Sequence, residues 1–189
     1  NEGHGAIAND LARYKHAAMN AQWDIKPRGT AYEFVNGQYL ELDDVNFVQL
    51  TGDMDITLSF WVKTTQQGTA TIFSNGRGNG DDMVQSNGRA NKWSVDLQDG
   101  MLYLRSEGQS YKLTPSAIND DSWHHVAVVL RRRGNLRTFV DNSPVSSHGV
   151  AQIGGLSGNR FWIGARGFIN TNNEITVGQE FTGKIHELR

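Results

Sequence analysis

Three side chains that together suit the binding of a polar ring lie close together in the segment WSVDLQDGMLYLRS, residues 93–106. Asp96 supplies a carboxylate, Tyr103 an aromatic face and Arg105 a guanidinium group. An aromatic face packs against the apolar side of a pyranose, while carboxylate and guanidinium groups hydrogen-bond to its hydroxyls. These residue types indicate sugar binding, provided that the backbone brings them onto one surface.

The element that positions these three side chains is a predicted β-hairpin. Asp99-Gly100 suits a two-residue type I′ turn, which places Gln98 opposite Met101. Counting outward from this turn places the apolar side chains of both strands on one buried face: Trp93, Val95, Leu97, Leu102 and Leu104. The opposite, non-core face then carries Ser94 together with the three candidate side chains.

A fourth candidate for ligand binding, Trp61, lies in the alternating segment DITLSFWVK. One face of this predicted strand is apolar and belongs to the core: Ile56, Leu58, Phe60 and Val62. Trp61 lies on the other face, where its ring would stack on a sugar if no second layer covers it. Cover by another part of the chain is the competing interpretation.

A further strand and a second hairpin are predicted downstream. The segment SWHHVAVVL is apolar at consecutive positions, which indicates a central strand covered on both sides. In LRTFVDNSPV, Asp141-Asn142 tolerates the positive φ values of a hairpin turn. His124 and His125 are adjacent on a strand and point to opposite faces, so they cannot chelate one metal and are expected to be structural.

Calcium is the ion that the sequence favours, because it takes hard oxygen ligands from irregular loops. Two loop regions, residues 75–92 and 166–180, are rich in such side chains. The candidate ligands are Asp81, Asp82, Asn172 and Asn173. The alternative is ordinary turn chemistry, in which Asn and Asp side chains hydrogen-bond to the loop backbone.

The start of the chain has a different pattern from the rest. Residues 6–20 are rich in alanine and space Ile7, Leu11, Tyr14 and Ala18 as one face of a short helix would. From Pro27 onward, short apolar stretches alternate with clusters of Gly, Asn and Asp, which is typical of antiparallel strands. We therefore expect an N-terminal helical or extended segment over residues 1–27 and one β-domain over residues 28–189.

Composition excludes several classes of function. The chain has 189 residues, a formal net charge of -2 and no cysteine. A nucleic-acid partner is not expected, because no long-range positive field would gather phosphates, and disulfides and thiolate metal sites are excluded. No apolar run approaches the roughly 20 residues that span a bilayer, so membrane insertion is not expected.

Catalytic patterns are weak throughout the chain. Hydrolysis of a glycosidic bond needs a pair of carboxyl groups at one linkage, which alternating acidic side chains on a single strand, for example Glu-X-Asp-X-X-Glu, would supply. The nearest string, Glu41-Leu42-Asp43-Asp44, lacks the last glutamate. Tyr103 and Arg105 have the residue types of a lyase base and its partner, and the run Arg131–Arg133 could read acidic glycans, but solvent-facing strand residues explain both. We expect a non-catalytic chain.

The motifs taken together resemble a known family. YEFVNGQYLEL, DITLSFWVKT, TIFSNG, SWHHVAVVL, FVDNSPV, FWIGAR and FTGKIHELR follow one another as do the strands of laminin G-like, concanavalin A-like jelly-roll domains. The resemblance implies an all-β, two-sheet antiparallel jelly-roll sandwich that binds glycans, proteins or calcium, or serves as a spacer. The absence of cysteines and of Asn-X-Ser/Thr sequons favours a bacterial origin.

The function expected from the residues and the resemblance is a lectin-like or adhesive module of a secreted, periplasmic or cell-surface protein. Its partner would be a glycan or polysaccharide, with calcium as the expected cofactor. The alternatives are a protein-binding or spacer domain of a larger surface protein and a polysaccharide-degrading enzyme. A neighbouring catalytic domain or adhesin repeat in the parent chain would discriminate among them.

Overall fold

The computed structural model describes residues 7–10, 15–19, 22–26, 29–35, 37–42, 55–75, 93–106, 109–131, 134–149, 161–169 and 175–189. In this part of the chain every regular element is a β-strand and none is a helix. The strands are β1 (Ile7–Asp10), β2 (Lys15–Met19), β3 (Gln22–Lys26), β4 (Gly29–Phe34), β5 (Leu40–Leu42), β6 (Ile56–Lys63), β7 (Thr69–Asn75), β8 (Trp93–Gln98), β9 (Met101–Ser106), β10 (Gln109–Lys112), β11 (His124–Leu130), β12 (Asn135–Val140), β13 (Ser143–Gly149), β14 (Phe161–Ile163), β15 (Arg166–Ile169), β16 (Ile175–Gly178) and β17 (Gly183–His186).

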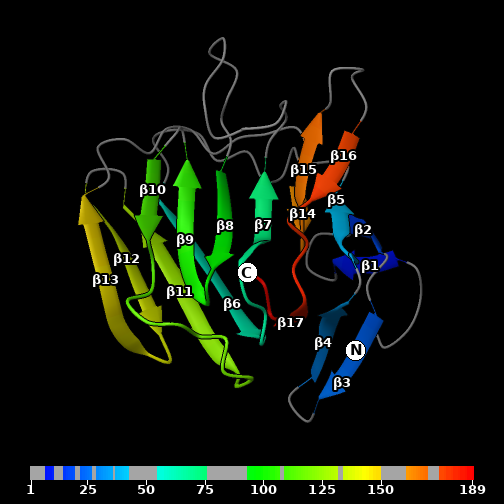
Figure 1. Cartoon of the computed structure of the whole chain (residues 1–189), viewed down its shortest axis with the longest axis horizontal. Coiled ribbons are helices and arrows are strands. Elements are labelled where there is room, and N and C mark those ends of the chain that lie inside the picture. Colours follow the sequence, from blue (N-terminus) through cyan, green and yellow to red (C-terminus); the bar gives the residue numbers. More distant parts are fainter. Residues whose placement is uncertain are drawn as a thin grey trace.

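Two large antiparallel sheets stack face to face (Figure 1). Sheet A has the strand order β1-β2-β5-β14-β7-β8-β9-β10, and sheet B has the order β13-β12-β11-β6-β17-β4-β3. Strands β15 and β16 form a separate two-stranded hairpin. The predicted all-β jelly-roll sandwich is confirmed.

The hydrophobic core lies between the two sheets. Phe60 of sheet B and Phe73 of sheet A meet edge to face with their ring centroids 4.7 Å apart. Along β6, Phe60 and Val62 are buried whereas Thr57 is exposed, which confirms the predicted alternation. Each sheet therefore keeps a second face, outside the sandwich, where binding side chains can lie.

Both predicted hairpins are confirmed. In the first, Gln98 pairs with Met101, and Asp99 and Gly100 have φ values of 49° and 80°, as a type I′ turn requires. In the second, Asp141 and Asn142 form the turn between β12 and β13 with φ values of 49° and 68°. Short polar side chains and glycine therefore fix the register of both strand pairs.

The predicted central strand is β11, which lies between β6 and β12. Its core-facing side chains Val126, Val128 and Leu130 are buried. Ala127 and Val129, on the opposite face, are half-buried. The central position was predicted correctly, but the expected cover on both sides was wrong, since sheet B buries only one face of this strand fully.

Of the two alternatives for the N-terminal segment, helical or extended, the described residues are extended, and the helical interpretation of residues 6–20 is wrong for them. Residues 7–10 and 15–19 form the strands β1 and β2, which pair with each other, and β2 continues sheet A by pairing with β5. Strand β3 extends sheet B by pairing with β4. An isolated helix of this length is marginal in water, so hydrogen bonding to existing sheet edges overrides the helical spacing of the apolar residues.

None of the described elements is a helix long and apolar enough to cross a membrane.

Candidate ligand-binding site

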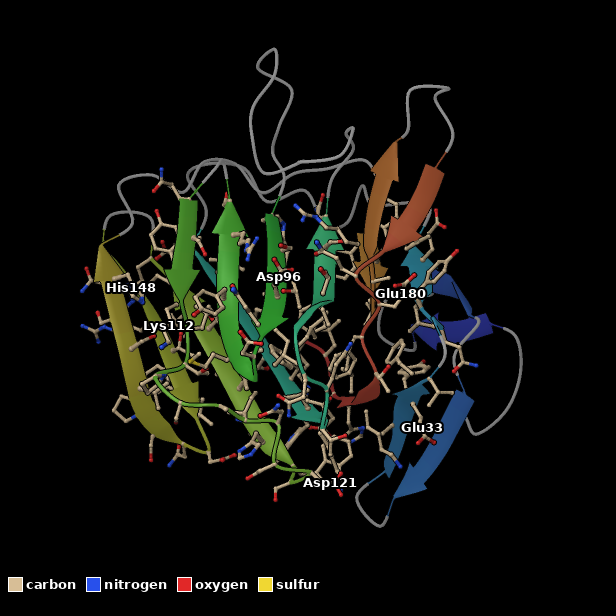
Figure 2. The ribbon with its side chains drawn as sticks, in the orientation of Figure 1. Glu33, Asp96, Lys112, Asp121, His148 and Glu180 are labelled. Carbon is tan, nitrogen blue, oxygen red and sulfur yellow. The ribbon has the colours of Figure 1, made fainter. Side chains whose placement is uncertain are left out.

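The predicted ligand-binding side chains of the first hairpin lie on the outer face of sheet A. In the strand register, Tyr103 on β9 is flanked by Asp96 on β8 and by Lys112 on β10. Figure 2 shows Asp96 and Lys112 on these strands, in the sheet nearer the viewer. Arg105 lies two residues beyond Tyr103 on the same face. The structure therefore brings Asp96, Tyr103 and Arg105 together as the register predicted.

Asp96 lies beneath this surface, because Arg105 crosses over it. The carboxylate is fully buried, whereas the Arg105 side chain is 28% exposed. Arg105 Nε is 3.2 Å from Asp96 Oδ2, and Arg105 Nη2 donates to Gln98 Oε1 at 3.3 Å. Asp96 thus positions Arg105, while Arg105 itself faces solvent.

A buried polar network fixes Asp96 from the other side. Thr71 lies directly opposite it on β7, next to a bulge, and donates its hydroxyl to Asp96 Oδ1 at 2.8 Å. Gln179, with a left-handed φ of 52°, places Oε1 3.2 Å from Thr71 Oγ1 and 3.5 Å from Arg166 Nη1. The network therefore links strands β7, β8 and β9 to the β15–β16 hairpin and preorganises the face above it.

The charge state of Asp96 reflects two opposing effects. Burial raises the pKa of Asp96 above its usual value of 3.8, because a carboxylate loses its hydration inside the protein. The hydrogen bond from Thr71 and the positive charges of Arg166 and Arg105 act in the opposite direction and reduce the rise. These partners are the groups that a buried carboxylate needs in order to keep its charge.

The accessible part of the site is basic and aromatic. Tyr103, Arg105 and Lys112 are all half-buried, so each presents part of its side chain to solvent. The sequence analysis did not single out Lys112 or the network residues Thr71, Gln179 and Arg166. The segment QSYK could have indicated Lys112. Tyr111 packs against the core, and because side chains alternate along a strand, the next residue, Lys112, lies on the outer face.

Trp61 does not join these residues, because it lies on the outer face of sheet B. Its register partners there are His125 on β11 and His186 on β17. The Trp61 and His125 rings are 5.1 Å apart at a tilt of 53°, and both residues are half-buried. The two aromatic candidates, Trp61 and Tyr103, therefore belong to opposite surfaces of the sandwich.

His124 points to the other face of β11 from His125, as predicted. Its Nδ1 lies 2.8 Å from Asp141 Oδ2, and its Nε2 lies 3.1 Å from Asp120 Oδ1. Burial by itself would lower the pKa of His124, but the hydrogen bonds and charges of Asp141 and Asp120 outweigh it and raise the pKa above 6.5. This pair of contacts joins two loops at one end of sheet B.

The predicted calcium ligands, Asp81, Asp82, Asn172 and Asn173, lie outside the described residues. Among the residues that are described, no group of three or more His, Cys, Asp or Glu side chains could hold a metal ion. Of the basic run, Arg131 is exposed, while positions 132 and 133 also lie outside the described part.

The fold and the side-chain arrangement define a concanavalin A-like jelly-roll domain. The family Laminin_G_3, of the concanavalin A-like lectin/glucanases superfamily, matches residues 34–189. The chain belongs to this laminin G-like family. Among curated relatives, neurexin-3a of Danio rerio is 30% identical over 114 residues, which are 56% of this chain and 7% of the neurexin. The chain thus spans a small part of that relative.

Solved structures share the fold at low sequence identity. Domain 4 of AbnA, a GH43 extracellular arabinanase from Geobacillus stearothermophilus in complex with arabinotriose, has a TM-score of 0.58 and 21% identity, covering 97% of this chain and 79% of that one. The heptameric SAP-like pentraxin from Limulus polyphemus has a TM-score of 0.58 and 19% identity, with coverages of 83% and 73%. The botulinum neurotoxin serotype G binding domain has a TM-score of 0.58 and 13% identity, with coverages of 95% and 44%.

Proposed function

We propose that this domain binds carbohydrate on the outer face of strands β8–β10. The observation that carries the proposal is the half-buried Tyr103, which lies between the register partners Asp96 and Lys112 on the outer face of sheet A. A tyrosine ring packs against the apolar face of a sugar, and Arg105 and Lys112 supply hydrogen-bond donors for its oxygen atoms. The buried Asp96 network reduces the entropy that Arg105 loses on binding.

The comparisons support this proposal through the chemistry of the related domains. The AbnA domain was solved with arabinotriose, and the toxin domain is a binding domain. AbnA is described as extracellular, which supports our proposal that this domain works outside the cell or at its surface. Calcium dependence remains part of the proposal.

A purely binding role is also proposed, and the charges on the face support it. Hydrolysis of a glycosidic bond requires two carboxyl groups about 5–10 Å apart. In strands β7–β10 the carboxylate-bearing residue is Asp96, which is buried beneath Arg105. The described part of this face therefore lacks the second acid that such chemistry needs.

The experiment is a glycan and polysaccharide binding panel with the intact chain, run with calcium and again with a chelator. We expect saturable binding that Tyr103→Ala weakens by at least tenfold and that Trp61→Ala leaves unchanged, because Trp61 lies on the other sheet. Loss of binding in chelator would support the calcium part of the proposal. Absence of binding to every glycan would contradict the carbohydrate proposal.

A protein-binding function is the second candidate, and the outer face of sheet B favours it. Half-buried apolar side chains gather there on neighbouring strands: Trp61, Ala127, Val129 and Phe139. Such side chains resemble the anchors of protein interfaces more than those of a sugar site. If Phe139→Ala and Trp61→Ala abolish binding to a polypeptide partner while Tyr103→Ala has no effect, this candidate replaces the first.

A further inference from the structure

The outer face around Tyr103 carries an excess of positive charge. The charged residues of strands β7–β10 and β15 are Arg105, Lys112, Arg166 and Asp96, which is three cations against one carboxylate. Asp96 is already in contact with Arg105 and under the influence of Arg166. Arg166 is buried, so the cations of this face that a ligand can reach are Arg105 and Lys112.

The half-buried cations Arg105 and Lys112 flank Tyr103 at distances that suit a sugar ring. Lys112 is the cross-strand partner of Tyr103, a relation that puts Cβ atoms about 4.5–5.5 Å apart. Arg105 is two residues from Tyr103 on the same strand, which corresponds to about 6.7 Å. A ring resting on Tyr103 would therefore bring a substituent within reach of both side chains.

Both cations keep hydrogen-bond donors free for such a substituent. Arg105 has five N–H donors. Its Nε contacts Asp96 and its Nη2 contacts Gln98. Its Nε lies at ion-pair distance from Asp96 without the alignment of a hydrogen bond. Lys112 forms no salt bridge with any other described residue, although its backbone carbonyl accepts from His148 Nε2.

From this arrangement we propose that the site is selective for acidic saccharides. The carboxylate or sulfate group of the sugar lies between Arg105 and Lys112, and its ring stacks on Tyr103. The inference rests on the proposed carbohydrate-binding function and specifies the ligand class of that same site. A neutral sugar leaves the Lys112 ammonium without a counter-charge, whereas an anionic group forms charge-assisted hydrogen bonds with both cations.

The test compares matched polymers by titration calorimetry with the intact chain. Polygalacturonate is compared with its fully methyl-esterified form, which keeps the ring and removes the charge. Dextran sulfate is compared with dextran, which distinguishes sulfate from carboxylate as the recognised group. We expect at least one acidic polymer to bind roughly tenfold more tightly than its neutral form, with an affinity that falls as salt is added.

Single-charge variants locate the effect on this face. Lys112→Gln and Arg105→Gln should each lower the affinity for the acidic polymer roughly tenfold. Arg137→Gln removes an exposed arginine from β12 of sheet B and should leave the affinity unchanged. Arg105→Gln also removes the ion pair with the buried Asp96, which lowers the stability of the fold. Lys112 lies on the edge strand β10 and has no such role among the described residues, so Lys112→Gln is the decisive variant.

The outcomes separate this inference from the proposed function. Equal binding of charged and neutral polymers, with loss on Tyr103→Ala, overturns acidic selectivity and leaves carbohydrate binding intact. Binding to a neutral glycan of the panel but to neither acidic polymer overturns acidic selectivity alone, and binding to no glycan at all overturns both. Equal weakening by Arg137→Gln and Lys112→Gln overturns the site, because the attraction would then be a general charge effect.

Discussion

His124 is held by two carboxylates, one at each ring nitrogen, and this arrangement favours its protonated form. An ionised carboxylate only accepts, so the contacts of 2.8 Å to Asp141 and 3.1 Å to Asp120 are both satisfied when each ring nitrogen carries a proton. The two contacts therefore favour the imidazolium form of the ring, in agreement with its raised pKa. In addition, the pKa of Asp120 is lowered, first by the backbone N–H of Ser122 and then by His124.

This pair of contacts predicts a pH dependence of stability. Because the folded pKa of His124 lies above the unfolded value of 6.5, its contribution is complete below pH 6.5 and is lost as the pH rises through the folded pKa. Urea unfolding of wild type and His124→Gln should therefore differ most at about pH 6 and least at about pH 9. A constant difference over that range would show that the ring is neutral in the folded protein.

Thr71 provides a second prediction, because its hydroxyl is the hydrogen-bond donor to the buried Asp96. Thr71→Val preserves the shape of the side chain but leaves Asp96 Oδ1 without this partner, which should lower the free energy of unfolding by about 1–3 kcal/mol. Thr69→Val is the matched control on the same strand and should change stability by less than about 0.5 kcal/mol, since Thr69 is exposed. Equal effects in urea unfolding would mean that the hydrogen bond does not stabilise the fold.

The sequence could place Asp96 on the correct face but not at the correct depth. Alternation along a strand gives the side to which a residue points, and it correctly grouped Asp96, Tyr103 and Arg105. The buried Asp96 contacts Arg105 and Thr71, and Thr71 in turn contacts Gln179, which lies 83 residues beyond Asp96 in the chain. Such contacts come from tertiary packing, which no local pattern specifies.

At the scale of the element, the turn of the first hairpin needs glycine at position 100 for two reasons, its backbone conformation and the space around it. Gly100 has a φ of +80°, and a Cβ atom there would clash with Asn119, lying 2.6 Å from its Cγ and 2.7 Å from Ala117 Cβ. Gly68 has a similar φ of +73° but no atom within 4 Å of such a Cβ. The two glycines therefore share the backbone strain that alanine would introduce and differ in the space around them.

This difference predicts unequal costs of substitution. Gly68→Ala should lower the free energy of unfolding by about 1–2 kcal/mol, the cost of a left-handed conformation for a residue with a Cβ. Gly100→Ala should cost about 1–3 kcal/mol more, because the added atom also overpacks the contact with Asn119. The measurement is urea unfolding of both variants. Similar values would show that the 113–123 segment moves aside at little cost.

Elements defined by local chemistry were predictable, and elements defined by distant partners were not. The turn residues Asp99-Gly100 and Asp141-Asn142 determine their own hairpins, so both registers followed from the sequence. The helical spacing in residues 6–20 was a weaker signal. It was overridden because β5, more than 20 residues away, offers β2 an edge to pair with.

On the scale of the whole molecule, two outer faces with different chemistry result from one sandwich. Alternation placed Tyr103 and Trp61 on non-core faces, but the sequence did not reveal that these faces belong to different sheets. Sheet order requires long-range pairing, such as that of β6 with both β11 and β17. A basic, polar surface and a half-buried apolar surface are consequently separated by the full thickness of the core.

The N-terminal strands complete both sheets, although the family match begins only at residue 34. Deleting residues 1–26 removes β1, β2 and β3. The pairing of β3 with β4, which comprises five residue pairs, and the pairing of β2 with β5 are then lost. At about 0.2–1 kcal/mol for each cross-strand pair, the loss of β3 alone should lower the free energy of unfolding by roughly 1–5 kcal/mol. The new sheet edges at β4 and β5 should also increase self-association, because unpaired backbone groups template further pairing.

Urea unfolding and light scattering of the shortened and intact chains test this prediction. Asp96, Tyr103, Arg105 and Lys112 lie on strands that the deletion does not touch, so ligand affinity should survive wherever the shortened chain stays folded. Unchanged stability would mean that β1–β3 are accessory to a self-sufficient sandwich. Loss of affinity at full stability would mean instead that the N-terminal strands take part in the site, which would contradict its assignment to the β8–β10 face.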